Sequence, residues 1–403
     1  MKKKATILLS LLLPLCAFAQ IENDFDATSP WPSDDRKGRL ELYADNLFFF
    51  QNNEFKTMAD GYSLPGLWVR PRLVYYPLEN LKIEAGAHLL FYNGAVRYPA
   101  GTYSDFPGYD GDDGKKMHAR PFFRAHLASK DDKLHIVFGN IYGGSFHRLI
   151  EPLYNPEQNL TADPENGLQA LFRSAHFDAD AWVDWKDFIF KDDDHQERFV
   201  VALSSDIKLN DPQKPLHWHI PLQIVGQHIG GEVQADEHHG ISSIANVAAG
   251  IGVTWNARRG VLKSISAESH FVGYKQLSGS SLPINDGYGW HNAVSARLGD
   301  FFVKAGHMSS RKFVSILGSP FFGSLSETDG QAVFKHSQLL YGKAEYSKRL
   351  KRVGAIGINL TLYQSFPGSG IDAAGETVGG GSQASIQAGV YLRINPSLLL
   401  HEF

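Results

Sequence analysis

The stretch "HARPFFRAHLA", residues 118–128, decides the fold class. In an extended strand successive side chains point to opposite faces, which makes one face of this stretch cationic and the other apolar. The cationic face holds His118, Arg120, Phe122, Arg124 and His126, and the apolar face holds Ala119, Pro121, Phe123, Ala125 and Leu127. A soluble sheet turns its apolar face inward. A membrane barrel turns that face toward lipid and its charges toward a wet lumen. The rest of the chain has to distinguish the two.

The N-terminus predicts export. Three lysines follow Met1, an apolar run extends over residues 5–15, and Ala17-Phe18-Ala19 forms an A-x-A cleavage site. We therefore expect a signal peptide at 1–19 and a periplasmic N-terminal segment at 20–37. A lipid anchor on Cys16 is the alternative, but Leu15 before it is bulkier than the residue usual at that position.

Composition narrows the function classes. Cys16 is the only cysteine of the 403 residues, so the mature chain has no disulfide, thiolate metal site or cysteine nucleophile. The net charge of −4 gives no basic balance of the kind that nucleic-acid binding requires. Glycine is frequent, with 39 residues, and aromatic residues reach 12%. These features fit an outer-membrane barrel or a large periplasmic β-protein.

The spacing of the apolar segments decides between these two. Period-2 runs predict about sixteen strands between residues 40 and 394. Their connections alternate strictly between short and long. The short ones are 77–80, 129–133, 178–179, 210–215, 256–260, 299–300 and 348–353; the long ones are 53–63, 94–117, 144–167, 191–197, 234–240, 276–288, 313–335 and 367–382. This rhythm predicts an all-β fold, a transmembrane antiparallel up-and-down β-barrel over 38–403 with long extracellular loops and short periplasmic turns.

Prolines and the C-terminus place local constraints on this barrel. Pro71 and Pro121 lie inside predicted strands, where each removes a ladder hydrogen bond, so we expect a β-bulge at both. The C-terminal "NPSLLLHEF" breaks the alternation at Pro396. Either the last strand continues past a bulge or the chain ends in a short periplasmic tail.

The leader, the sixteen strands, the alternating connections and the terminal Phe403 together resemble a bacterial outer-membrane porin over nearly the whole mature chain. The resemblance is architectural. It implies location in the outer membrane of a Gram-negative bacterium and passive diffusion of small polar or anionic solutes. It implies contact with outer-membrane lipid and lipopolysaccharide and allows for a homotrimer. We expect no enzymatic activity, no catalytic residue, no cofactor and no nucleic-acid partner.

Strand parity predicts a basic wall inside the lumen, consisting of Arg70, Arg72, Lys82, Arg120 and Arg124. In the sixteen-stranded porins that this chain resembles, the third long loop folds into the barrel and faces such a wall with carboxylates. Loop 144–167 is the third long loop here, and it carries Glu151, Glu157, Asp163 and Glu165. Opposed charges across a constriction create a transverse field that selects polar solutes. The alternative is that these charges only brace the wall, in an open or a plugged barrel that serves as adhesin or envelope scaffold.

Two other sequence patterns are candidate sites. His307 and Ser309 share the lipid-facing side of their strand, which resembles the outer-membrane phospholipase and suggests a lipid-facing hydrolase. However, the Asn that follows the serine in that family is absent here. "ADEHHG" at 235–240 groups Asp236, Glu237, His238 and His239, but the composition of a polar turn explains it equally well, so no metal site is predicted.

Overall fold

The structure is a computed structural model. It describes residues 30–93, 117–188, 196–230, 240–257, 260–328, 331–350, 354–379 and 381–403. The leader at 1–19 and the four acidic and histidine side chains of the 235–240 motif lie outside these ranges.

The described chain is built almost entirely of strands. The first half contains β1 (Arg39–Glu54), β2 (Tyr62–Leu78), β3 (Leu81–Tyr92), β4 (Met117–Ala128), β5 (Leu134–Asn140), β6 (Asn166–Arg173), β7 (Phe177–Asp187) and β8 (Arg198–Lys208). The second half contains β9 (Leu216–Ile229), β10 (Ser242–Asn256), β11 (Leu262–Ser278), β12 (Asp286–Leu298), β13 (Phe301–Arg311), β15 (Ser337–Leu350), β16 (Gly354–Pro367), β19 (Gln383–Ile394) and β20 (Ser397–Glu402). Short helical turns are η1 (Asp34–Arg36), η2 (Gly144–His147), α2 (Gln158–Thr161) and η3 (Pro320–Phe322).

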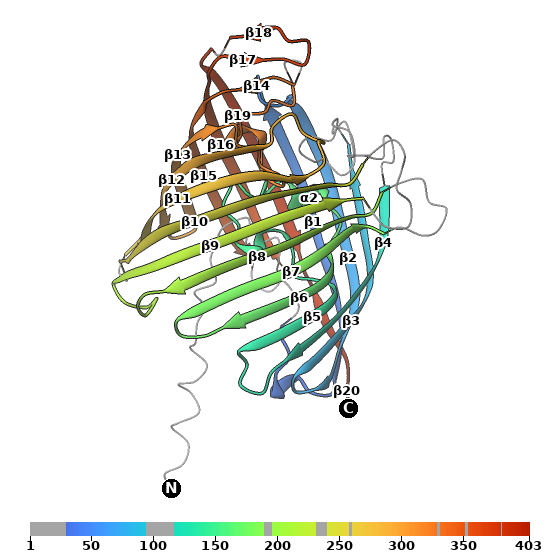
Figure 1. Cartoon of the computed structure of the whole chain (residues 1–403). Coiled ribbons are helices and arrows are strands. Elements are labelled where there is room, and N and C mark those ends of the chain that lie inside the picture. The colour runs from blue at the N-terminus through green and yellow to red at the C-terminus, as the bar shows by residue number, and fades with distance from the viewer. Residues whose placement is uncertain are drawn as a thin grey trace.

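These strands close into one antiparallel barrel. Each strand pairs with its neighbour in the chain, and β1 closes the ring by pairing with β19 and β20 as well as with β2. Because β19 and β20 are two parts of one strand along the same edge of β1, the described residues form a barrel of sixteen strands (Figure 1). The predicted fold class is confirmed.

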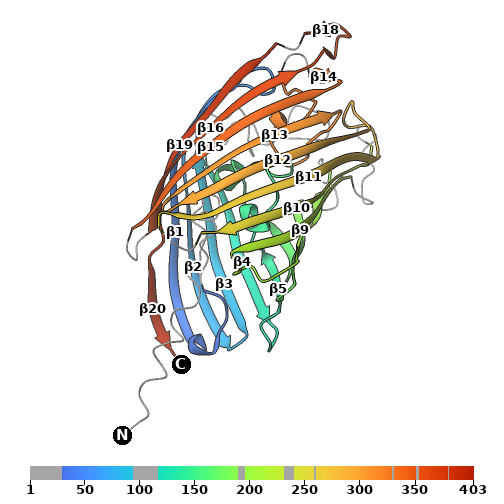
Figure 2. The same ribbon diagram turned by 90° about the vertical axis from the view of Figure 1, so that its left-hand side faces the viewer.

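The short and long connections separate to opposite ends. The C-terminus lies at the end of the short turns, and three two-residue strands lie beyond the other end (Figure 2). These are β14 (Val333–Phe334), β17 (Gly370–Ile371) and β18 (Thr377–Val378), which form a separate small sheet. The long connections mark the extracellular end of such a barrel. Among the described residues, helices are short and none is long and apolar enough to cross a membrane.

The faces of the strands follow the predicted parity. On β4, Phe123 and Leu127 point outward and are 48% and 47% exposed, whereas Arg124 and His126 are buried inside. The outward face of the other strands is likewise apolar, for example at Ile224, Val294 and Val390. Lipid contact explains this pattern, because mid-bilayer Arg or Lys on the lipid side of a barrel costs about 2–4 kcal/mol each.

The two prolines are accommodated without bulges, so that expectation was wrong. Pro71 pairs with Ala44 of β1 and falls in a gap of the β2–β3 ladder, whose register is the same on both sides of the gap. Pro121 pairs with Ala87 of β3 and lies beyond the end of the β4–β5 ladder. Pro121 therefore removes no ladder hydrogen bond on the β5 side, whereas at Pro71 the ladder is interrupted locally without a change of register. At the C-terminus, β20 resumes pairing with β1 after Pro396, which selects the first of the two alternatives.

Two of the long connections and the N-terminal segment pack inside the barrel. Ile141, Leu153, Phe313 and Phe322 belong to one buried cluster with inward side chains of β5–β15. Asn246 of β10 donates a hydrogen bond from Nδ2 to the carbonyl oxygen of Val314 at 2.8 Å. Near the short-turn end, Trp31 lies against His135 with 4.4 Å between ring centroids. The lumen of the described structure is therefore largely filled by its own chain.

Candidate functional site

The basic wall is a buried ion network around Glu84. The Glu84 carboxylate lies 2.9 Å from Lys82 Nζ, 2.6 Å from Arg72 Nε and 3.4 Å from Arg124 Nη1. All four side chains are almost fully buried. The hydroxyl oxygen of Tyr142, from the connection after β5, accepts a hydrogen bond from Lys82 Nζ at 2.9 Å, and the Tyr142 ring lies under the Arg124 guanidinium at 4.0 Å. Arg72, Lys82 and Arg124 are thus brought together, and they bind a wall carboxylate and the inward loop.

Arg120 and Arg70 lie differently. Arg120 Nε donates to Asp163 Oδ2 at 3.0 Å, which joins the wall to the third long loop, and the Arg120 side chain remains 60% exposed. Arg70 stacks over the Trp68 ring at 4.8 Å and donates to His88 Nδ1 at 3.4 Å. Of the four loop acids, only Asp163 pairs with one of the wall arginines in the described residues.

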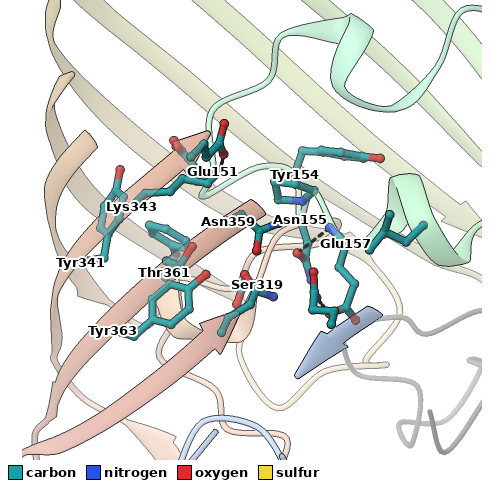
Figure 3. A pocket seen from close by; sticks show the side chains of 16 residues that line it. Glu151, Tyr154, Asn155, Glu157, Ser319, Tyr341, Lys343, Asn359, Thr361 and Tyr363 are labelled. Carbon is teal, nitrogen blue, oxygen red and sulfur yellow. Dashed lines mark hydrogen bonds and ion pairs between the residues drawn. The ribbon is translucent and has the colours of Figure 1, made fainter. Parts of the chain in front are cut away.

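The other three loop acids bind elsewhere in the lumen. Glu151 pairs with Lys304 of β13. Glu157 accepts hydrogen bonds from Gln51, Tyr62 and Asn53. Glu151 and Glu157 line a small cavity of about 50 Å³ between the inward loop and the wall of β15 and β16. Tyr341 and Tyr363 lie on the wall side of this cavity (Figure 3). Burial raises the pKa of Glu157, which its three hydrogen-bond donors only partly offset.

Glu165 belongs to a carboxylate–histidine–carboxylate group. His147 Nε2 lies 2.9 Å from Glu165 Oε2, and its Nδ1 lies 2.8 Å from Asp180 Oδ2 of β7. The ring stacks on Trp182 at 3.5 Å. Burial alone would lower the pKa of His147, but the two carboxylates outweigh it and raise that pKa to about 10. The imidazolium therefore anchors the loop to the wall, and both of its nitrogens are engaged.

A second luminal cavity, of about 200 Å³, lies between the inward loop and the wall of β6–β9 and β11. His219 is held there by Asp206, with 2.7 Å between Nδ1 and Oδ1, and its Nε2 lies 3.8 Å from Glu268 Oε1. Gly252 pairs with both His219 and Glu268 across the sheet, and a Cβ at this glycine would collide with the His219 ring. No group of three or more metal-ligating side chains with suitable geometry occurs in the part of the chain that the structure describes.

The lipid-facing surface carries a different arrangement. Ser309 is near the extracellular end of β13 on its outward face, and its Oγ lies 3.1 Å from Nε2 of His336, the residue before β15. Across the sheet Ser309 pairs with Trp290 of β12 and Gln338 of β15. His307, the expected partner, pairs across the sheet with Asn292 and Leu340 instead. A hydroxyl within hydrogen-bond reach of an imidazole nitrogen is the arrangement of an activated serine nucleophile.

His336 was not predicted as a site residue, because it follows a long connection whose path depends on tertiary contacts. Asn292 and Ser269 were not predicted either, although they form a hydrogen-bonded polar group on the same outward surface. Strand parity could have identified both residues, because they occupy outward positions of β11 and β12 beside apolar outward residues such as Phe271 and Val294. The Asp206–His219 pair could not be anticipated, because the two side chains come from adjacent strands across a seven-residue connection.

Comparison with solved structures finds other outer-membrane proteins. OpdK of Pseudomonas aeruginosa with vanillate matches at a TM-score of 0.48 and 10% identity, covering 89% of this chain and 99% of that one. OmpT of Vibrio cholerae in its trimer form matches at 0.47 and 10%, and OccAB3 of Acinetobacter baumannii at 0.47 and 7%, with the same coverage. At these values the likeness assigns no function to this chain. Among curated proteins, none matches.

A family model gives a direct assignment. The model described as Lipid A 3'-O-deacylase-type matches residues 32–403, which include every strand of the barrel. Because this is an enzyme family, the expectation that the protein has no enzymatic activity was wrong; a barrel fold does not by itself determine function. The chain belongs to the Lipid A 3'-O-deacylase-type family.

Proposed function

We propose that this barrel is a lipid esterase of the outer membrane, with Ser309 as nucleophile and His336 as general base. The hydrogen bond of 3.1 Å between Ser309 Oγ and His336 Nε2 on the lipid-facing surface carries the proposal. The family match supports it, since that family is named for removing an ester-linked acyl chain from lipid A. A substrate that resides in a membrane leaflet would reach this side chain without entering the lumen.

The chemistry follows from the two side chains. Ser309 Oγ attacks the ester carbonyl carbon and passes its proton to His336 Nε2. The tetrahedral intermediate then collapses, the bond between the carbonyl carbon and the alcohol oxygen breaks, and the imidazolium returns the proton to the leaving alcohol. Water, deprotonated by His336, next attacks the acyl-serine, which releases the fatty acid and regenerates Ser309.

The position of the pair suits an ester at the membrane interface. Ser309 lies one step from Arg311 on the same outward face, and Arg311 is exposed at the end of β13. Toward the membrane centre the outward neighbours become apolar, at Val294, Val303 and Leu340. Ester groups of lipids lie between headgroups and hydrocarbon, so the serine is at the depth where such a bond is presented.

The direct test uses lipid A in phospholipid vesicles that contain the full barrel. Mass spectrometry should detect loss of one acyl chain and release of a free fatty acid by the wild-type protein. Ser309→Ala should abolish the release while the barrel remains folded, as judged by its heat-dependent mobility. Equal release by both proteins would reject Ser309 as the nucleophile, and absence of release by wild type would reject the activity on this lipid.

Passive diffusion of small polar solutes is the second candidate. It is favoured by the Arg120–Asp163 pair, whose arginine stays water-accessible between the wall and the inward loop. In this candidate Arg70, Arg72, Lys82, Arg120 and Arg124 would form the basic wall, opposite Glu151, Glu157, Asp163 and Glu165. If solutes pass through the barrel, planar bilayers should show conductance steps. Arg120→Ala should then shift the reversal potential toward cation selectivity. The matched control is Lys133→Ala, in an exposed turn. Silent bilayers, or equal shifts in both variants, would count against it.

A further inference from the structure

Three polar side chains form a row across the lipid-facing surface below Ser309. Ser269 of β11 pairs directly with Asn292 of β12, and Asn292 pairs directly with His307 of β13. The row ends at apolar residues on both sides, because Ser269 pairs with Ile251 and His307 pairs with Leu340. The row is therefore an isolated polar patch on a surface that otherwise contacts hydrocarbon.

The row is internally organised by hydrogen bonds. Ser269 Oγ donates to Asn292 Oδ1 at 2.7 Å. The indole Nε1 of Trp290, on the same strand, donates to Ser269 Oγ at 3.0 Å and to Asn292 Oδ1 at 3.2 Å. These bonds fix the Asn292 carboxamide with its oxygen satisfied. Among the described residues no acceptor is recorded for its Nδ2, so two N–H donors remain available at the lipid surface.

Leaving the Asn292 N–H groups without an acceptor costs free energy of folding unless a ligand supplies that acceptor. A polar group that faces hydrocarbon without a partner destabilises the barrel, and water does not reach far below the interface to supply one. An ordinary fatty acyl chain offers nothing but methylene groups at this depth. An acyl chain that carries a hydroxyl or an amide offers both a donor and an acceptor.

The position of the row relative to Ser309 defines what it would bind. His307 is two residues deeper than Ser309 on β13, and Asn292 is two residues beyond Trp290, the cross-strand partner of Ser309. Two residues of a strand span about 7 Å. We propose that the row of Ser269, Asn292 and His307 is a specificity site for acyl chains that bear a hydroxyl or amide group on the membrane side of the scissile ester. The proposal rests on the proposed esterase for the identity of that ester.

The test compares two synthetic lipids with the same headgroup and chain length, one with and one without a hydroxyl on the ester-linked acyl chain. Wild-type barrel in vesicles should hydrolyse the hydroxylated lipid with a kcat/KM about 10–100-fold higher, as expected when the other lipid leaves one hydrogen-bonding group without its partner. Asn292→Leu should reduce this ratio to near one. Val294→Leu, a change at the next outward position of β12, should keep the wild-type ratio. A ratio near one in wild type, or an unchanged ratio in Asn292→Leu, would overturn the proposal.

A binding measurement separates failure of this proposal from failure of the esterase. Barrels incubated with an equal mixture of the two lipids are washed in detergent, and the retained lipids are quantified by mass spectrometry. If Ser309→Ala hydrolyses as well as wild type but only Asn292→Leu loses its enrichment of the hydroxylated lipid, the esterase assignment fails and the specificity site stands. If wild type and Asn292→Leu retain the two lipids in the same proportion, the specificity site is rejected whatever the hydrolysis shows.

Discussion

Ser309 and His336 are 27 residues apart in the chain, and a hydrogen bond of 3.1 Å joins Oγ of the first to Nε2 of the second. The strand β13 presents the serine to lipid, and the chain returns to the same rim after a long connection packed inside the barrel. The last residues of that connection are anchored on both sides, because Ser337 begins β15 and Gly368 donates its N–H to the His336 carbonyl oxygen at 2.8 Å. The imidazole is thus held beside the serine by the ladder and not by a flexible loop.

Removing either member of this pair should stop ester hydrolysis. Ser309→Ala and His336→Gln should each lower kcat by about 10³-fold or more, and the double variant should be little worse than either single one, because residues that act as a unit are strongly non-additive. Release of radiolabelled fatty acid from vesicles measures this. His228→Gln, at another histidine that is hydrogen-bonded to a serine hydroxyl, is the matched control in which kcat should fall far less. If the fold-losses in kcat of the two single variants multiplied in the double variant, the two residues would act separately.

The Glu84 network should dominate the stability of the wall. Glu84→Gln leaves Arg72, Lys82 and Arg124 without their common carboxylate in a buried place. Breaking a buried ion pair in this way typically costs about 3–5 kcal/mol of the free energy of unfolding, which urea titration of the barrel in vesicles can measure. Asp131→Asn removes an exposed ion pair with Lys133 and should leave the titration unchanged. Equal midpoints for Glu84→Gln and wild type would show that Glu84 contributes no net stability.

The His147 group predicts a loss of stability at high pH. The folded-state pKa of about 10 lies above the ordinary value of 6.5, so folding favours the imidazolium. The resulting stabilisation is complete below pH 6.5 and is lost as the pH rises through 10. The thermal midpoint of wild type should therefore fall between pH 6.5 and 10.5 by more than that of His147→Gln. Parallel pH profiles of the two proteins would contradict this assignment.

The last strand segment should be needed for a stable closure. β20 supplies the partner for residues 39–43 of β1, and the backbone N–H of Phe403 donates to the Gly38 carbonyl oxygen at 2.9 Å. Deleting residues 397–403 leaves those ladder groups of β1 without partners on that side and should lower the heat-modification temperature of the barrel. Phe403→Ala keeps every backbone bond and should lower it much less. An unchanged temperature in the deletion would show that β19 alone closes the ring.

Much of the barrel could be predicted because its determinants are local. The alternation of Phe123 and Leu127 with Arg124 and His126 is a property of adjacent residues, and it fixes which face meets lipid. The turn between β6 and β7 lies at 174–176 and not at the predicted 178–179, because Asp178 and Ala179 belong to β7. In the structure the Asp178 carboxylate faces the lumen and binds Lys208, and Asp180 on the same face binds His147.

The site could be predicted only in part. The alternation of residues along β13 predicts that Ser309 faces outward. Its partner His336, however, depends on the path of a connection of more than twenty residues. The same holds for the loop acids: Glu151 pairs with Lys304, which is 153 residues away and does not belong to the predicted basic wall. Long-range pairings of this kind are set by how loops pack inside the lumen, which strand periodicity does not describe.

The outward position of Ser309 has a consequence for how such an enzyme would be supplied. Substrate would arrive by lateral diffusion within one leaflet, so the rate would depend on its mole fraction in the membrane and not on a bulk concentration. Both products would leave into the same leaflet, with no gate to open. The lumen could then remain packed throughout turnover, and leakage across the envelope would be decoupled from catalysis.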